Sequence, residues 1–372
     1  MMKNPLLGEI IKRIEESPEQ GIPFPKFMEM ALYHPRWGYY QRNKPKLGRE
    51  GDFFTNAHVG ELYGQVLGRF CAKWIRRFAA DGDWMVVEMG AGDGRLAEQV
   101  GKGLIDARIP PEEIRFHLVE TSPFHQRLER ARLASSPISY RFHTRLQEIP
   151  PGKVAFIYSN ELVDAFPVHR IKKDGGLILE AWVAKGKDDK LTQKWIPLGP
   201  DSADLIKLGS ELHDGEILEV SQAAHQWLKE VARWLNKGVL VTIDYGASTR
   251  VLRQKKGTLR GFKKHRVMQN ILEAPGEIDL TCDVNFSLLE EWGRQEGLIP
   301  AGNFTQMEFL LKCGIAELLP SKVPTDPFSP EAKRVREIKQ LIHPHAMGES
   351  FRILIQCKGL EMNRGQMIFN HE

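Results

Sequence analysis

A short apolar stretch that runs into an acidic residue and three alternating glycines constrains this chain more than any other feature. Met85–Val87 is followed by Glu88, and then by Gly90, Gly92 and Gly94. The apolar residues suit a strand buried on both faces of a parallel sheet, and glycine allows a sharp turn where a side chain would clash with a ligand. The dinucleotide fingerprint G-x-G-x-x-G would need a glycine directly after Gly94, so that fingerprint fails. The stretch predicts a strand, a ligand-binding turn and a following helix; the alternative is a connection that binds nothing.

A second apolar stretch ends in another carboxylate about one helix and one strand further on. Residues Ile114–Val119 lead directly into Glu120. In a doubly wound sheet, ligands lie across the carboxyl ends of the strands, where an acid can accept hydrogen bonds from both hydroxyls of a ribose. The separation from Glu88 fits one βαβ unit of about 30 residues. We therefore predict that Glu120 holds a ribose; the alternative is a solvated strand end.

The composition indicates an ordinary globular protein. Of the 372 residues, 42% are hydrophobic and 27% are charged, and the formal net charge is +4. The near balance of basic and acidic residues gives no sign of nucleic-acid binding. No apolar run approaches the ~20 residues that span a bilayer. The first residues lack the features of an export signal. The four cysteines lack C-x-x-C spacing, which argues against a zinc ribbon or a disulfide framework. We expect a cytoplasmic protein with reduced thiols, no metal and no membrane partner.

Alternating strands and helices along the chain predict an α/β fold with a doubly wound parallel sheet. Residues 1–80 are expected to form a helical, aromatic-rich segment packed on the core, and residues 81–372 the core itself. Two insertions are expected, at about 168–215, which opens with a β-hairpin around Asp174–Gly176, and at about 247–285. The last strand, 351–357, is expected to run antiparallel to its neighbour.

The acceptor chemistry is predicted where Asn160, Glu161 and Asp164 follow the strand at 154–158. If the chain turns into a helix there, these polar groups converge at the ligand-binding edge of the sheet. Carboxylates bind a guanidinium by paired hydrogen bonds and can orient its nitrogen for attack. A guanidinium or amine substrate is therefore predicted. The alternative is a helix cap, with Asn160 or Asp164 as the capping side chain.

The glycine turn resembles motif I of S-adenosylmethionine-dependent methyltransferases, and nearly the whole chain resembles one family of them, the MidA-like methyltransferases. The resemblance is carried, in chain order, by Ala31–Pro35 with Gly38–Tyr40, Gly51–Thr55, Glu88–Gly94, Asn160–Glu161 with Asp164–Pro167, Asp244–Gly246, Gly257–Arg260 with His265, Pro275–Gly276 with Asp279–Thr281, Thr305–Gln306 with Phe309–Leu310, and Met347–Glu349. So many separate motifs in one order make a chance match improbable.

The resemblance implies a Rossmann-like class I methyltransferase sheet, S-adenosylmethionine as the cofactor and methylation of a protein arginine. It also implies an acceptor that is a subunit of respiratory complex I in mitochondria, or its counterpart in bacteria. The expected cofactor-binding residues are Glu88, Gly90, Ala91, Gly92, Gly94 and Glu120. Glu161, with Asn160 and Asp164, is expected to orient the acceptor arginine.

One position departs from the family, which tends to carry Ala-His-Val-Asp-Phe where this chain reads Cys282–Phe286. Asp283 replaces the histidine and changes the local charge by about one unit. The loss keeps open a second interpretation, a non-catalytic assembly factor that binds the cofactor and holds a partner subunit. A nucleic-acid methyltransferase is disfavoured, because Asn160–Glu161 is not followed by the Pro-Pro-aromatic sequence that supports a flipped base.

The first prediction is that Gly92→Val abolishes binding of S-adenosylmethionine. The branched side chain would enter the space of the ligand, and a turn with positive φ at this residue excludes valine. Calorimetric titration measures the affinity, and circular dichroism checks that the variant is folded. A folded variant that binds with wild-type affinity would remove the glycine turn from the site.

Overall fold

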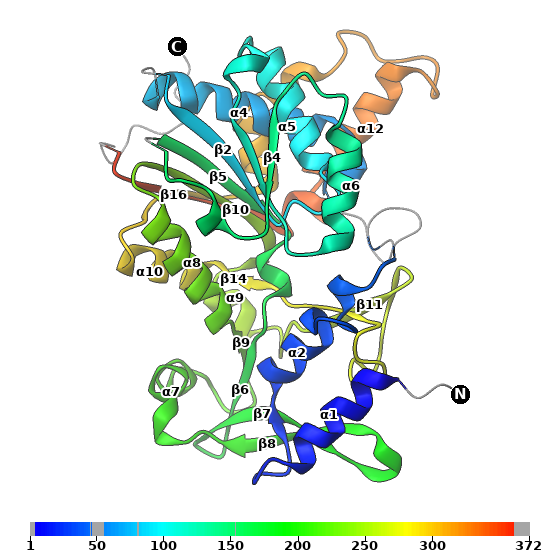
Figure 1. Ribbon diagram of the computed structural model, residues 1–372, viewed down its shortest axis with the longest axis vertical. Helices are drawn as coiled ribbons and strands as arrows, with labels where there is room; N and C mark the ends of the chain where they lie inside the picture. The colour runs from blue at the N-terminus through cyan, green and yellow to red at the C-terminus, as the bar shows by residue number, and fades with distance from the viewer. Residues whose placement is uncertain (1–3, 45, 47–55, 80–81, 153, 361–372) are drawn as a thin grey trace. The chain divides into compact units, whose positions relative to one another are not determined.

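The computed structural model describes residues 4–44, 46, 56–79, 82–152 and 154–360. The chain divides into two compact units, each made of three stretches. The first unit comprises residues 1–53, 163–227 and 246–289, and the second comprises 54–162, 228–245 and 290–372. Figure 1 shows the elements of both units. The motif Gly51–Thr55 lies outside the described residues.

The described part of the second unit is built on one mostly parallel sheet. Its strands are β2 (Trp84–Met89), β3 (Phe116–Val119), β4 (Tyr140–His143), β5 (Val154–Asn160), β10 (Gly238–Ala247), β15 (Ile299–Thr305) and β16 (Phe351–Lys358). Their order across the sheet is β15-β16-β10-β5-β2-β3-β4. The strands from β10 to β4 pair in parallel, whereas β16 runs antiparallel to both β10 and β15. The doubly wound sheet and the antiparallel last strand are therefore confirmed.

The helices of this unit are α3 (Asn56–Val59), α4 (Leu62–Phe78), α5 (Arg95–Asp106), α6 (Pro123–Leu133), α11 (Gln306–Lys312) and α12 (Pro330–Ile342). Two more, α8 (Gln222–Trp234) and α10 (Phe286–Gln295), begin in the first unit and end in the second. Every residue of β2 is buried, as expected for a strand covered on both faces. The main core joins the sheet to α4, α5, α11 and α12, for example where the rings of Trp74 and Phe156 lie 5.7 Å apart.

Helices α4 and α5 approach each other through glycines. A Cβ on Gly68 would lie 2.3 Å from the Val100 carbonyl oxygen, and one on Gly103 would lie 2.3 Å from the Gln65 carbonyl oxygen. Both contacts are to backbone atoms, which cannot move aside as a side chain could. The close packing of α5 on α4 fixes the helix that leads away from the glycine turn.

The first unit is largely antiparallel within its described residues. The strand order of one sheet is β1 (Ile22–Pro23), β7 (Leu177–Lys185), β6 (His169–Asp174) and β9 (Ile217–Val220), and β8 (Leu191–Pro197) also pairs with β7. The strand order of another sheet is β12 (Arg266–Val267), β11 (Arg260–Lys263) and β13 (Asp279–Thr281). The unit also holds α1 (Pro5–Glu15), α2 (Phe24–Tyr33), α7 (Ala203–Ser210), α9 (Thr249–Arg253) and β14 (Val284–Asn285), which pairs with the last two residues of β10. The predicted hairpin is confirmed as β6 and β7.

The aromatic segment near the N-terminus forms a core of its own unit. Phe24, Phe27 and Tyr39 are fully buried there, beside Val183 of β7 and Leu280 of β13. No helix in the part of the chain that the structure describes has the length and apolar character needed to cross a bilayer.

The second prediction is that Gly103→Ala lowers the free energy of unfolding by ~1–3 kcal/mol, because the new methyl group must push α5 away from the α4 backbone. Gly8→Ala is the matched control, since a Cβ on this helical glycine would meet nothing within 4 Å. Alanine favours helix over glycine by up to ~1 kcal/mol, so the control is expected to be neutral or stabilising. Chemical denaturation measures both, and equal stability of the two variants would contradict the packing argument.

Candidate active site

The sheet of the second unit reverses its winding direction between β2 and β5. The chain runs from β2 outward to β3 and β4, and then returns to β5 on the other side of β2. Ligands of doubly wound sheets bind at this reversal, beyond the carboxyl ends of the strands. The segments that follow β2 and β5 meet there, because a Cβ on Gly90 would lie 2.9 Å from Cδ1 of Leu162.

The glycine turn after β2 has the backbone conformation that its sequence predicts. Gly90, Gly92 and Gly94 have φ angles of +75°, +58° and +75°, a region that residues with side chains rarely adopt. The Val119 carbonyl oxygen at the end of β3 accepts the N–H groups of Gly90 and Ala91 at 2.8 and 3.3 Å. Helix α5 begins directly after the turn. The predicted strand, turn and helix are therefore confirmed.

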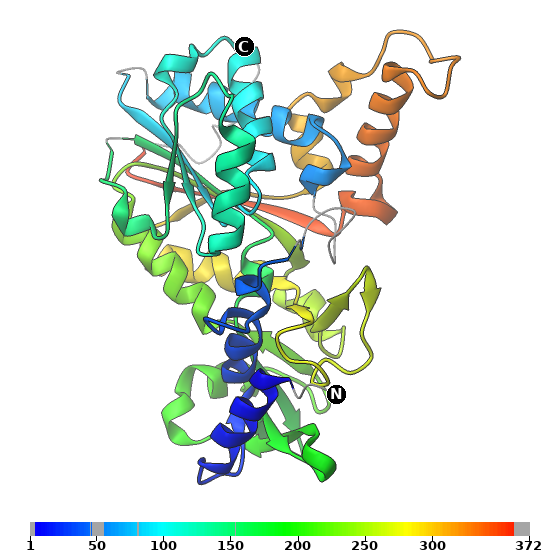
Figure 2. The ribbon, with the colours of Figure 1, turned by 45° about the vertical axis from the view of Figure 1, so that its right-hand side comes forward.

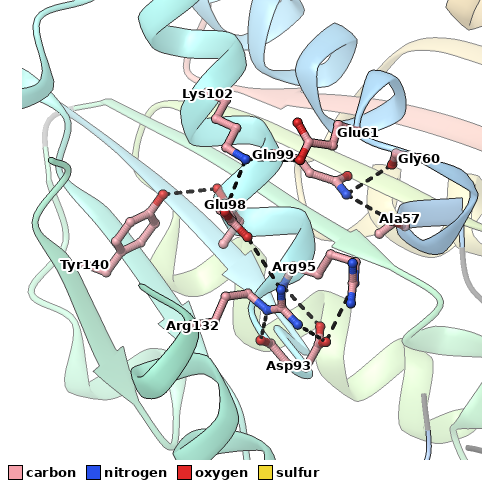
Figure 3. A network of polar contacts seen from close by, with 11 residues as sticks. Ala57, Gly60, Glu61, Asp93, Arg95, Glu98, Gln99, Lys102, Arg132 and Tyr140 are labelled. Atoms are coloured by element: carbon pink, nitrogen blue, oxygen red, sulfur yellow. Dashed lines mark hydrogen bonds and ion pairs between the residues drawn. The ribbon is translucent and has the colours of Figure 1, made fainter. Parts of the chain in front are cut away.

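An ion network from α6 holds the turn through Asp93. Arg132 donates from Nε to the Asp93 carbonyl oxygen at 2.9 Å and from Nη2 to its carboxylate at 2.7 Å. Figure 3 shows this network extending to Glu98, 3.6 Å from Arg132, and on to Lys102, 3.2 Å from Glu98. Asp93 also accepts the N–H of Arg95 at 3.1 Å. Arg132 is not predictable from the sequence, because it lies 39 residues from Asp93 without a local pattern that links them.

Glu120 lies at the end of β3, as predicted, and is 8% exposed. One carboxylate oxygen accepts the N–H of Gly92 at 2.9 Å, and the other accepts the N–H of Ser122 at 2.7 Å. These two contacts fix the orientation of the carboxylate. Glu120, which is predicted to bind the ribose, is thus hydrogen-bonded directly to Gly92, the middle glycine of the turn.

Two more carboxyl groups are buried behind the turn. Glu88, predicted at the cofactor, is 3% exposed and accepts a hydrogen bond from the Tyr158 hydroxyl at 2.9 Å, and burial raises its pKa well above the usual range. Glu129 of α6 is fully buried, and neither of its carboxyl oxygens has a hydrogen-bond partner among the described residues. Burial, and then the charge of Glu120, raise the pKa of Glu129 to about 8. The raised pKa of each group favours its neutral form, which limits repulsion between the carboxyl groups.

Glu161 occupies a strained position at the end of β5. Its φ is +52°, and its N–H continues the sheet by donating to the Ile243 carbonyl oxygen at 3.0 Å. One carboxylate oxygen accepts the backbone N–H of Asn56 and the side-chain N–H of Asn160, both at 3.1 Å. Tyr63 donates its hydroxyl to Asn160 at 3.3 Å. Strained residues of this kind cluster at functional sites, because the surrounding contacts hold them in place.

Side chains far away in the sequence support the Asn56 contact. Asn56 donates from Nδ2 to Gln306 at 2.8 Å, and Gln306 donates to the Leu341 carbonyl oxygen at 2.8 Å. Gln99 of α5 donates to the carbonyl oxygens of Ala57 within α3 and of Gly60 just after it, at 2.9 and 3.1 Å (Figure 3). Among these residues, Gln306 belongs to a motif of the family resemblance, which is the signal that could have identified it.

Asp164 belongs to the first unit, whereas Asn160 and Glu161 belong to the second. The helix on which their expected convergence depended does not form, since residues 163–165 make a single 3-10 turn. Asp164 is 5% exposed, and burial raises its pKa to about 7 against the opposing effect of Arg260. Asn160 and Glu161 are therefore in direct contact, whereas Asp164 lies among residues of the first unit.

Asp283, which replaces the family's histidine, is charge-compensated within the first unit. Its two carboxylate oxygens lie 2.7 Å from Nη2 of Arg260 and 2.7 Å from Nζ of Lys255. Its N–H donates to the hydroxyl of Thr258 at 3.0 Å. The substitution thus adds a negative charge that two neighbouring cations neutralise.

The residues around the glycine turn fit a nucleoside with an attached amino acid. Glycine positions with positive φ keep the turn free of side chains that would cover its backbone, and the N-terminus of α5 follows directly. Glu120 is a fixed hydrogen-bond acceptor at the carboxyl end of the neighbouring strand, which is the kind of group that ribose hydroxyls need. The described residues contain no cluster of three or more side chains that could bind a metal ion.

Comparison with known proteins agrees with this fit. The model of a family described as "Putative S-adenosyl-L-methionine-dependent methyltransferase" matches residues 66–303. A crystal structure from Burkholderia thailandensis, bound to S-adenosyl-homocysteine, superposes with a TM-score of 0.86 at 28% identity, covering 96% of this chain and 93% of that one. A native crystal structure from the same species gives a TM-score of 0.83 at 27% identity, covering 96% and 92%.

Curated relatives match over most of their length. Protein arginine methyltransferase NDUFAF7, mitochondrial, of Danio rerio is 27% identical, covering 88% of this chain and 81% of the relative. The homologue of Drosophila melanogaster is 28% identical, covering 91% and 82%. The protein of Bos taurus is 28% identical, covering 94% and 82%.

The third prediction concerns the buried Glu129. Because its pKa is raised from 4.5 to about 8 in the folded protein, the folded state binds more protons than the unfolded state in this interval. The contribution of Glu129 to the stability of the wild type is therefore fully present below about pH 4.5. This contribution is lost as the pH rises to about 8. Glu129→Gln removes the ionisation, so the variant is expected to be more stable than wild type at pH 8 by ~2–4 kcal/mol and similar at pH 5.

Urea denaturation at both pH values measures the difference. Glu112→Gln, at an exposed position, is the control and is expected to show no pH-dependent change relative to wild type. A constant difference between wild type and Glu129→Gln at the two pH values would show that Glu129 does not titrate in this range.

Proposed function

Because the chain belongs to the family of S-adenosylmethionine-dependent methyltransferases, we propose that it methylates an arginine side chain of a partner protein. The names of the relatives support this acceptor, since three of them are called protein arginine methyltransferases and each is matched over more than four fifths of its length. The observation that carries the proposal is the position of Glu161, a carboxylate oriented at the point where the sheet reverses direction.

In this proposal, the cofactor lies over the glycine turn. Gly90, Ala91, Gly92 and Gly94 receive its amino acid end, and Glu120 receives the ribose hydroxyls. Glu88 acts from beneath the turn, where its hydrogen bond to Tyr158 fixes it. The hydrogen bond between Gly92 and Glu120 supports a shared role in binding the cofactor, because movement of either group would displace the other.

The acceptor guanidinium is bound by Glu161 and positioned by the groups around it. When bound, S-adenosylmethionine would supply a methyl group carried on a positively charged sulfur. The sulfur would leave as a neutral thioether as a guanidinium nitrogen bonds to the methyl carbon. Glu161 pairs with the guanidinium and aligns that nitrogen, and the product loses one proton from the methylated nitrogen to solvent. Asn56 and Asn160 fix the carboxylate through donated hydrogen bonds, so little reorganisation is needed during the reaction.

The family resemblance also assigns Asp164 a role in acting on the acceptor arginine. Its buried carboxyl, with a pKa raised to about 7, is suited to accept or release a proton near neutral pH. Its role rests on the family motif Asp164–Pro167 and on this titration, rather than on a contact with Glu161.

The family resemblance extends the proposal to the partner and the compartment. The acceptor implied is a subunit of respiratory complex I or its bacterial counterpart. We place the protein in the cytoplasm on the basis of its composition, while the names of its animal relatives place those proteins in mitochondria. Labelling of a lysate with radioactive S-adenosylmethionine, followed by hydrolysis of the labelled protein, tests the acceptor. Methylarginine is expected, and label in lysine or in nucleic acid would contradict the proposal.

The fourth prediction is that Glu161→Gln leaves cofactor affinity within about twofold of wild type and lowers single-turnover methyl transfer at least about a hundredfold, because an amide cannot pair with a guanidinium through two acceptors. Calorimetry measures the affinity, and quenched reactions with the labelled acceptor measure the transfer. Glu113→Gln, at an exposed glutamate of the same unit, is the control and is expected to match wild type in both. Transfer by Glu161→Gln at the wild-type rate would exclude this residue from the chemistry.

A further inference from the structure

The segment that leads into α12 presents large apolar side chains to solvent. Val323 is 90% exposed and Phe328 is 91% exposed, while Leu319 is 45% exposed. In Figures 1 and 2 this segment, drawn in orange, forms a loop that projects from the rest of its unit. A phenylalanine side chain that is almost fully exposed contributes no hydrophobic stabilisation to the folded state, since its apolar surface is as hydrated as in the unfolded chain.

Hydrogen bonds fix the conformation of this loop. Asp326 accepts the N–H of Phe328 at 2.8 Å on its carboxylate and the hydroxyl of Ser329 at 2.9 Å on its carbonyl oxygen. Ser329 then caps α12 by accepting the N–H of Ala332 at 3.1 Å. Arg336 of α12 donates to the Pro327 carbonyl oxygen. Residues 326–329 therefore form a defined turn, and this turn carries the exposed side chain of Phe328.

Cationic residues outnumber acidic ones in the loop and in α12. The cations of residues 319–342 are Lys322, Lys333, Arg334, Arg336 and Lys339, and the acidic residues are Asp326, Glu331 and Glu337. Glu337 lies 3.8 Å from Lys333. Lys322 directly precedes Val323, and Arg336 contacts the turn that carries Phe328. The tip thus combines two apolar side chains with a surplus of cationic ones.

We propose that the loop 319–329 is a docking site for the surface of a bilayer that contains anionic lipids. Val323 and Phe328 enter the boundary between headgroups and acyl chains, and Lys322, Arg334 and Arg336 bind the lipid phosphates. Two separate apolar side chains on a projecting turn suit this occupant, because lipids accept single side chains without a matching surface. A protein partner of standard size would need a contiguous face of ~800 Å² on each side.

The proposal departs from the expectation, drawn from the sequence, that the protein has no membrane partner. That expectation rested on the lack of an apolar run long enough to span a bilayer. The structure adds the exposure of Val323 and Phe328, which no run of apolar residues would reveal. Surface docking is independent of the proposed arginine methylation, since none of the loop residues belongs to the cofactor or acceptor site.

Sedimentation with vesicles tests the proposal on the full-length protein. The wild type is expected to co-sediment with vesicles of phosphatidylcholine containing about 30 mol% phosphatidylglycerol, and much less with phosphatidylcholine alone. Binding is expected to weaken as the salt concentration rises from about 0.05 to 0.5 M. The double variant Val323→Asp/Phe328→Asp is expected to bind anionic vesicles at least about tenfold more weakly, since both anchors are lost and negative charge is added.

The controls separate membrane docking from other effects. Leu177→Asp changes an apolar side chain that is 58% exposed in the first unit, and this variant is expected to bind vesicles like wild type. The double variant is expected to keep the melting temperature and cofactor affinity of the wild type, because both substituted side chains are in water. Absence of wild-type binding to anionic vesicles, or equal binding by the double variant, would overturn the proposal. So would a wild-type dimer in light scattering that the double variant converts to a monomer, since the loop would then be a protein interface.

Discussion

The candidate site depends on the hydrogen bonds that Gly90 and Ala91 donate to the Val119 carbonyl oxygen. They tie the turn after β2 to the end of β3, so the glycine backbone and Glu120 are held at adjacent strand ends. The Gly92–Glu120 hydrogen bond then closes the arrangement from the other side. Because parallel pairing of β2 with β3 sets the register of both strand ends, the sheet itself determines where the groups proposed to bind the cofactor lie.

Charge around this turn is balanced by two different means. On the outer side, Asp93 is neutralised by Arg132, whose guanidinium makes contacts with both its backbone and its carboxylate. On the inner side, Glu88 and Glu129 are buried, and their pKa values are raised because burial disfavours the ionised form. A raised pKa favours the neutral form of both groups beside Glu120, which limits repulsion without requiring further cations.

The acceptor side of the site is built differently, from contacts between distant segments. Glu161 follows β5 and is strained, and its carboxylate depends on α3 for a backbone donor. Helix α3 is short and is held in turn by Gln99 and Gln306, from α5 and α11. A change in α11 or α12 would reach Glu161 through these hydrogen bonds, so the acceptor site is more sensitive to remote parts of the unit than the glycine turn is.

The sequence by itself determined the strand, turn and helix around Gly90–Gly94, the place of Glu120, the β6–β7 hairpin and the antiparallel last strand. These features follow from local rules, since glycine permits positive φ and apolar periodicity marks strands and helices. The sequence did not predict β8, β15, α11 or α12. The convergence that it predicted after β5 depended on a helix, and a single 3-10 turn forms there instead. Only the tertiary structure decided that Asn56 binds Glu161, that Arg132 holds Asp93 and that Phe328 lies in solvent. Such contacts join residues 39 to 105 positions apart, and burial depends on what packs against a residue, so neither is encoded in a local pattern.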